Sequence, residues 1–192
     1  MDIKRIEMFS DGVMAIILTL MVLSLRRPAN YELSALRPLL PLFLSYVLSY
    51  AVICVAWNSH HQLFQMVSKM DRRCLWANFH LLFWLSLLPF ATDWMGESQF
   101  ARWPTALYGL VMLMVGLAFM LLDKSFSRLH GTFSDVNWIA HRVRLERLSA
   151  LLFALGIGLS FIYPWLSFIL YVVVSMAWVI PRPLPQVPQP GD

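Results

Sequence analysis

The residues of this chain that could do chemistry are an aspartate inside an apolar helix and two adjacent histidines. Ser10 and Asp11 lie near the start of the apolar segment 5–25, RIEMFSDGVMAIILTLMVLSL, and the histidines are His60 and His61. The segment is long enough to cross a bilayer, where a lone carboxylate costs roughly 2.5–3.5 kcal/mol unless it finds partners or water. The sequence therefore predicts a helix that helps to form a pathway through the membrane rather than a plain anchor.

Polar residues of three apolar segments fall at the depth of Asp11. At 1.5 Å per residue, Asp11 lies roughly 8–10 Å inside the membrane, and the second and third segments place polar side chains in the same layer. Because buried polar groups in a membrane must find one another, we expect a hydrogen-bond network there. Its expected members are Ser10, Asp11, Trp57, Asn58, His60, His61 and Asn78.

The chemistry of this layer has more than one interpretation. The network could simply pin helices together, within or between subunits, or His60 or His61 could make gating sensitive to protons, because histidine titrates near physiological pH. A metal site is disfavoured, since adjacent histidines point about 100° apart on a helix. Catalysis is not expected, because no nucleophile, base and orienting group stand together as a set, and we predict that the protein is not an enzyme.

A different edge of the first segment is apolar. Successive residues lie about 100° apart around a helix, and the i, i+3, i+4, i+7 spacing places on one edge Ile16, Thr19, Leu20 and Leu23. Ser10 and Asp11 fall on other faces of the same helix. This stripe fits either ordinary helix packing or a hydrophobic constriction around a pore, which gates by dewetting. The spacing alone does not choose between them.

The elements that must position these residues are transmembrane helices. Hydrophobic residues make up 59% of the 192 residues and charged residues only 14%, whereas soluble domains average about 25% charged. The apolar segments lie at 6–25, 39–67, 74–92, 104–122, 148–162 and 165–180. We therefore predict an all-α membrane protein with six transmembrane helices over 1–181 and a proline-rich, disordered tail over 182–192.

Two further expectations come from the charged residues and the cysteines. Most of the fifteen lysines and arginines lie on the side of the membrane that holds the amino terminus, which predicts that both termini are cytoplasmic. Cys54 and Cys74 lie in apolar runs and are expected to be two buried free thiols.

The run RIEMFSD at 5–11 resembles the RxxxFSD motif of the transmembrane-protein-175 family of potassium channels. The following AIILTLMVLSL resembles the pore-lining helix of that family, and WNSHHQLF at 57–64 and WANFHLLFWLSLLPFAT at 76–92 resemble its second and third helices. The resemblance covers the first half of the chain and agrees with the expected number of spans beyond it.

The resemblance implies a cation channel without a re-entrant filter loop. It implies the single-repeat prokaryotic type, a homotetramer in the cell membrane with four first helices around the axis. It places Ile16, Leu20 and Leu23 at the hydrophobic pore positions and Thr19 at a polar pore position. It assigns Arg5, with Ser10, Asp11, Trp57 and a histidine of the 60–61 pair, to the motif and its helix-packing network.

The function predicted in this way is a potassium-permeable channel with a hydrophobic constriction formed by the first helix of each subunit. We expect no cofactor, and K⁺ is the permeant ion. The expected partners are further copies of the same chain and membrane lipid, and not nucleic acid. The alternative from another class is a proton-coupled secondary transporter with an Asp/His relay, although the chain shows no repeated halves with broken helices. A third possibility is a structural or assembly membrane protein that conducts nothing.

Overall fold

The computed structural model describes residues 2–28, 30–67, 69–130 and 136–179, excepting the side chains of 130 and 136–142. Within these ranges the regular structure is entirely helical. The elements are α1 (Ile3–Leu23), the 3-10 helix η1 (Leu33–Leu39), α2 (Leu40–Gln65), α3 (Arg72–Ser86), α4 (Leu88–Glu97), α5 (Arg102–His130), α6 (Val136–Leu159) and α7 (Pro164–Val179). The predicted all-α class is confirmed.

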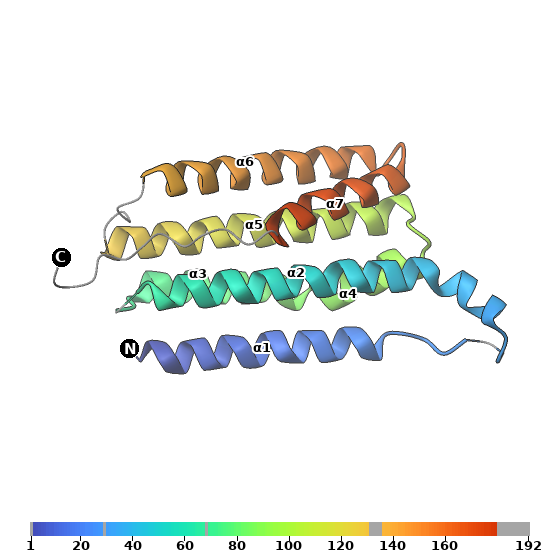
Figure 1. Cartoon of the computed structure of the whole chain (residues 1–192), viewed down its shortest axis with the longest axis horizontal. Coiled ribbons are helices and arrows are strands. Elements are labelled where there is room, and N and C mark those ends of the chain that lie inside the picture. The colour runs from blue at the N-terminus through green and yellow to red at the C-terminus, as the bar shows by residue number, and fades with distance from the viewer. Residues whose placement is uncertain (1, 29, 68, 131–135, 180–192) are drawn as a thin grey trace.

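The helices run back and forth along one long axis, as Figure 1 shows. The helical stretches long and apolar enough to cross a membrane, among the described residues, are Ile3–Leu23, Leu33–Gln65, Arg72–Glu97 and Arg102–Leu129. The helix α7 is apolar but has only 16 residues. The helix α6 completes the bundle, and its first half carries the charged residues Arg144, Glu146 and Arg147.

The helices of the structure differ in extent from the third and fifth predicted segments. The third span is two helices, because Pro89 cannot donate a backbone hydrogen bond to the preceding turn, and α3 ends at Ser86 before α4 begins at Leu88. The fifth apolar segment, predicted at 148–162, lies in the second half of the longer helix α6, which begins at Val136 with a charged stretch. Cys54 is exposed, so only Cys74 fits the expectation of buried thiols.

The helix α1 lies at the edge of the bundle, against α2, α3 and α4 (Figure 1). Asp2 caps its first turn, because the side chain accepts a hydrogen bond from the backbone N–H of Lys4. At the other end, Arg26 beyond the helix forms an ion pair with Glu97 of α4. One face of α1 is buried, and it carries Ile6, Ser10, Met14, Ile17 and Met21.

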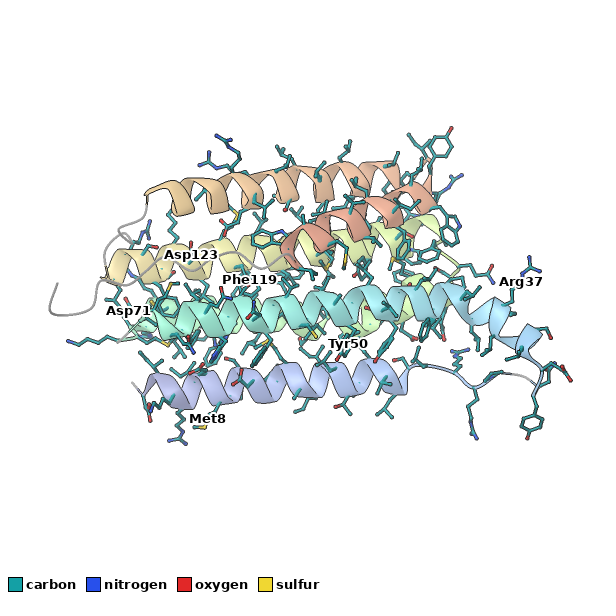
Figure 2. The ribbon with its side chains drawn as sticks, viewed as in Figure 1. Met8, Arg37, Tyr50, Asp71, Phe119 and Asp123 are labelled. Carbon is teal, nitrogen blue, oxygen red and sulfur yellow. The ribbon has the colours of Figure 1, made fainter. Side chains whose placement is uncertain are left out.

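The two ends of the bundle are distinct. Figure 2 shows Met8, Asp71 and Asp123 at the end where α1 begins and Arg37 at the opposite end. The first of these is the end predicted to be cytoplasmic, and the assignment of that side stays a prediction. The predicted tail 182–192 lies outside the described residues, so the division of the chain at 181 is also still a prediction.

Candidate functional site

The exposed edge of α1 carries the predicted pore residues. Ile16, Leu20 and Leu23 are 60%, 50% and 74% exposed, respectively. Thr19 is also exposed, and its hydroxyl donates to the carbonyl oxygen of Ala15 at 3.0 Å. The core of the protomer is instead built by the opposite face of the helix. Packing within the protomer therefore does not account for the apolar stripe.

A fully buried hydrogen-bond chain joins the first three helices. Asn78 of α3 donates from Nδ2 to Ser10 Oγ of α1 at 3.0 Å. Its Oδ1 lies 2.9 Å from His60 Nε2 of α2, and because an amide oxygen can only accept, the imidazole Nε2–H donates. Ser10 Oγ in turn donates to the carbonyl of Ile6 at 2.9 Å. All three polar side chains are 0% exposed, so they pin α1, α2 and α3 at one level.

The carboxylate of Asp11 has a different partner. Trp57 of α2 donates from Nε1 to Asp11 Oδ1 at 3.0 Å. The indole also stacks on the His61 ring, with centroids 5.5 Å apart and an interplanar angle of 4°. Asp11 is thus tied to α2 through an aromatic pair rather than to α3.

The second histidine extends this cluster to two residues that sequence reasoning missed. His61 Nδ1 lies 2.9 Å from Glu7 Oε1, and its Nε2 lies 2.7 Å from Gln65 Nε2. Glu7 precedes Asp11 by one helical turn and Gln65 follows His61 by one turn, so i, i+4 spacing was the signal that could have found them.

The structure separates residues that the sequence placed together. His60 points into the core and stacks on Phe64, whereas Trp57 and His61 lie on the side of α2 that meets the polar face of α1. Arg5 and Asn58 are exposed, and the structure brings neither into these clusters. The site is therefore two clusters at one end of α1, one around Asn78 and one around Trp57 and His61, and not a single connected network.

This arrangement connects α1 to α2 and α3 through hydrogen bonds between side chains. Among the described residues, no group of three or more His, Cys, Asp or Glu side chains is placed to hold a metal ion. His60 Nδ1 is buried without a protein partner, so this imidazole has one unused acceptor. The clusters fix the angle of α1, and the angle of α1 sets the direction of its exposed edge.

Comparisons with known proteins found a matching family model and several relatives of this chain. The family model described as endosomal/lysosomal potassium channel TMEM175 matches residues 5–89. A protein named a potassium channel from Chryseobacterium sp. is 44% identical over 177 residues, which cover 92% of each chain. Human TMEM175, named an endosomal/lysosomal proton channel, is 34% identical over 113 residues, covering 53% of this chain and 22% of the human protein.

The fold has a solved counterpart as well. The crystal structure of a lysosomal potassium-selective channel TMEM175 homologue from Chamaesiphon minutus matches with a TM-score of 0.79 and 29% identity. The match covers 92% of this chain and 96% of that one. A relative 44% identical in sequence and a solved homologue each match 92% of this chain, and the protein belongs to the TMEM175 family.

Proposed function

We propose that this chain forms a potassium-permeable channel in which several copies, four on the family pattern, place their α1 helices around a central axis. The observation that carries the proposal is the exposed edge of α1, with Ile16, Leu20 and Leu23 turned away from the protomer's own core. Relatives named potassium channels share most of the chain with it.

The apolar edge of α1 is long enough to form more than one ring of side chains around a pore. Ile16 and Leu23 are seven residues apart, so at 1.5 Å per residue they span roughly 10 Å along the axis. Four copies of each side chain would form stacked apolar rings that exclude water when narrow. The same edge begins at Gly12, where an added Cβ would meet nothing within 4 Å, which leaves room for a second helix to approach.

Conduction through such rings requires partial loss of water from the ion. In the open state the rings dilate and potassium passes with part of its hydration shell. The Thr19 hydroxyl donates its proton to Ala15, so the lone pairs of its oxygen can replace some of that water. Sodium holds its water more tightly, and the selectivity expected from this difference is modest because aliphatic groups replace no hydration.

The polar clusters hold the rings in register. Ser10, Asn78 and His60 fix the height of α1, and the contact from Trp57 to Asp11 fixes its rotation. A small tilt of α1 about these clusters would move Leu20 and Leu23 further than Ser10, since they lie about three to four turns away. In this mechanism the clusters act as the pivot and the apolar edge acts as the gate.

The experiment that tests the proposal is reconstitution of the purified full chain into planar bilayers, with native mass measurement of the detergent-solubilised complex. A tetrameric mass and ohmic unitary currents whose reversal potential follows the potassium gradient are expected. Slow, saturable, proton-coupled flux would favour the transporter, and absence of flux from a stable complex would favour a structural role. Reversal potentials that follow only the pH gradient would favour proton conduction, which the name of the human relative makes worth measuring.

A further inference from the structure

The outward face of α6 combines an apolar stripe with two arginines. At about 100° per residue, one narrow face of the helix carries Arg144, Leu148, Leu151 and Leu155, with Arg147 beside them. The three leucines are 50%, 68% and 61% exposed, respectively, and both arginines are exposed. This face is therefore not used for packing within the described part of the protomer.

The place of α6 in the bundle exposes this face to lipid. Figure 1 shows α1 and α6 at opposite edges of the bundle. With α1 around a central axis, as proposed above, α6 lies at the periphery of the assembly, where an exposed stripe of leucines meets lipid chains. For this one step the inference rests on the proposed function.

Three aromatic residues mark the level of the membrane surface at the end of α6. Trp103 lies at the start of α5, and Tyr163 and Trp165 lie on either side of Pro164, where α7 begins. Their side chains are 70%, 60% and 50% exposed, respectively. Exposed tryptophan and tyrosine at one end of a bundle are typical of the membrane–water interface. Because α6 ends at Leu159, just before this level, depths along α6 can be counted from that residue.

Both arginines lie closer to this level than the thickness of the apolar layer. Arg147 and Arg144 precede Leu159 by 12 and 15 residues, which is roughly 18 and 22 Å along the helix. The hydrocarbon core of a bilayer is about 30 Å thick. The two side chains therefore leave α6 within the apolar layer, where an unpaired charge is costly, and must extend toward the headgroups.

Neither arginine has an acidic partner among the described residues. The ion pairs in the described part of the chain join other residues. The carboxylate between them in the sequence, Glu146, is only 9% exposed on the other side of α6 and has an interaction of its own. The two guanidinium groups therefore need an anion from outside the protomer, and the leucines beside them indicate an anion that carries hydrocarbon chains.

We propose that this face of α6 binds a phospholipid with an anionic headgroup, from the leaflet at the end of the bundle where α1 begins. The phosphate accepts hydrogen bonds from Arg144 and Arg147, because a planar guanidinium group matches phosphate oxygens. An acyl chain lies along Leu148, Leu151 and Leu155, which span roughly 10 Å of the helix. A zwitterionic lipid carries its own cation beside the phosphate, so the face prefers an anionic headgroup.

The test is native mass spectrometry of the purified, delipidated full chain in detergent, titrated with phosphatidylglycerol or with phosphatidylcholine of the same acyl chains. One tightly bound phosphatidylglycerol per chain is expected, with phosphatidylcholine at least roughly tenfold weaker, as for the loss of two cation–phosphate contacts. The double variant Arg144→Gln/Arg147→Gln should remove this preference. The control is Arg72→Gln/Arg73→Gln, which removes the same charge from exposed residues of α3 and should keep the preference.

Equal affinity of the parent protein for the two lipids would overturn the proposal, as would a preference that survives in Arg144→Gln/Arg147→Gln. A preference lost equally in both double variants would also overturn it, because the lipid would then respond to net charge and not to α6. If the α6 double variant does not fold, the single variants decide, since each should lower the preference. The same spectra count the chains in the complex, so a monomer that keeps the preference would contradict the proposed assembly without removing the lipid site.

Discussion

Asn78 of α3 donates a hydrogen bond to Ser10 of α1 across 3.0 Å, and neither residue is exposed at all. The same amide accepts from His60 of α2, so one side chain connects three helices. A buried amide of this kind is replaceable only at a cost, because water cannot reach the groups that it leaves behind. The position of the first helix therefore depends on Asn78.

Replacing Asn78 with leucine should destabilise the protein by about 1–3 kcal/mol for each buried group left without a partner. The groups affected are the hydroxyl of Ser10 and the Nε2–H of His60. Unfolding of the purified protein in a detergent titration measures the loss. Asn58→Leu is the matched control, because Asn58 is exposed on the neighbouring helix, and its effect should be within about 0.5 kcal/mol. Equal losses in the two variants would show that the buried chain contributes no stability.

Asp11→Ala should reduce the fraction of assembled channel and the total current, with little change in the reversal potential between potassium and sodium. The change removes the acceptor of Trp57 Nε1 and frees the rotation of α1 against α2. Asp11→Asn is the control, because the amide keeps an acceptor oxygen and should assemble better than the alanine variant. Normal assembly of Asp11→Ala with altered selectivity would place Asp11 at the ion pathway instead.

Leu20→Ala should raise the leak current in bilayers, because it widens one apolar ring and makes that part of the pore easier to wet. Val22→Ala is the control, since Val22 is also exposed on α1 but lies off the edge that Leu20 shares with Ile16. An unchanged closed-state conductance in Leu20→Ala would remove Leu20 from the constriction.

The apolar edge of α1 could be predicted from the sequence because helical periodicity alone places Ile16, Leu20 and Leu23 together. Its opposite face, with Ser10 in the core, follows from the same angles. The contacts between side chains of different helices could not be predicted equally well. Trp57, His60 and His61 share i, i+3 and i, i+4 spacing, yet the rotation of α2 sends His60 into the core and leaves the other two beside α1.

The remaining differences between the predicted and the observed structure depend on contacts and propensities that a hydropathy profile does not include. The contact of Glu7 with His61 could not be predicted from the sequence, because it depends on two different helices bringing Glu7 Oε1 within 2.9 Å of His61 Nδ1. The break at Leu87 depends on whether surrounding helices straighten a proline segment or let it end a helix. The apolar segment 148–162 marks only the second half of α6, because charged residues lower hydropathy without lowering helix propensity.

Asp71, in the loop before α3, should make the stability of the fold depend on pH. Asp71 caps α3 by accepting from the backbone N–H of Cys74 at 2.8 Å, and this bond lowers the pKa of its carboxyl below the usual value. Since the folded pKa is the lower one, the stabilisation is present above the unfolded value, about 3.9, and is lost as the pH falls through the folded value. Asp71→Asn keeps the cap without titrating. Unfolding midpoints at several pH values between 6 and 3 should fall more steeply for the parent protein, and parallel curves would contradict the assignment.

The packing of α7 against α5 and α6 depends on two glycines that make room for one ring. Tyr171 is fully buried, and a Cβ at Gly109 would overlap its hydroxyl and lie 2.6 Å from its Cζ, while a Cβ at Gly156 would overlap the ring edge. The Tyr171 hydroxyl donates to the carbonyl oxygen of Thr105 at 3.4 Å, so moving the ring away from Gly109 would also cost this hydrogen bond. Gly109→Ala should therefore lower the free energy of unfolding by about 1–3 kcal/mol through overpacking.

Gly116→Ala is the control, because Gly116 lies two turns along the same helix with open space at its Cβ. This variant should be as stable as the parent protein or more stable, because alanine favours helix over glycine by about 1 kcal/mol. Detergent unfolding of the two variants measures the contrast, and a Gly109→Ala protein as stable as Gly116→Ala would mean that α7 does not seat its tyrosine between these helices.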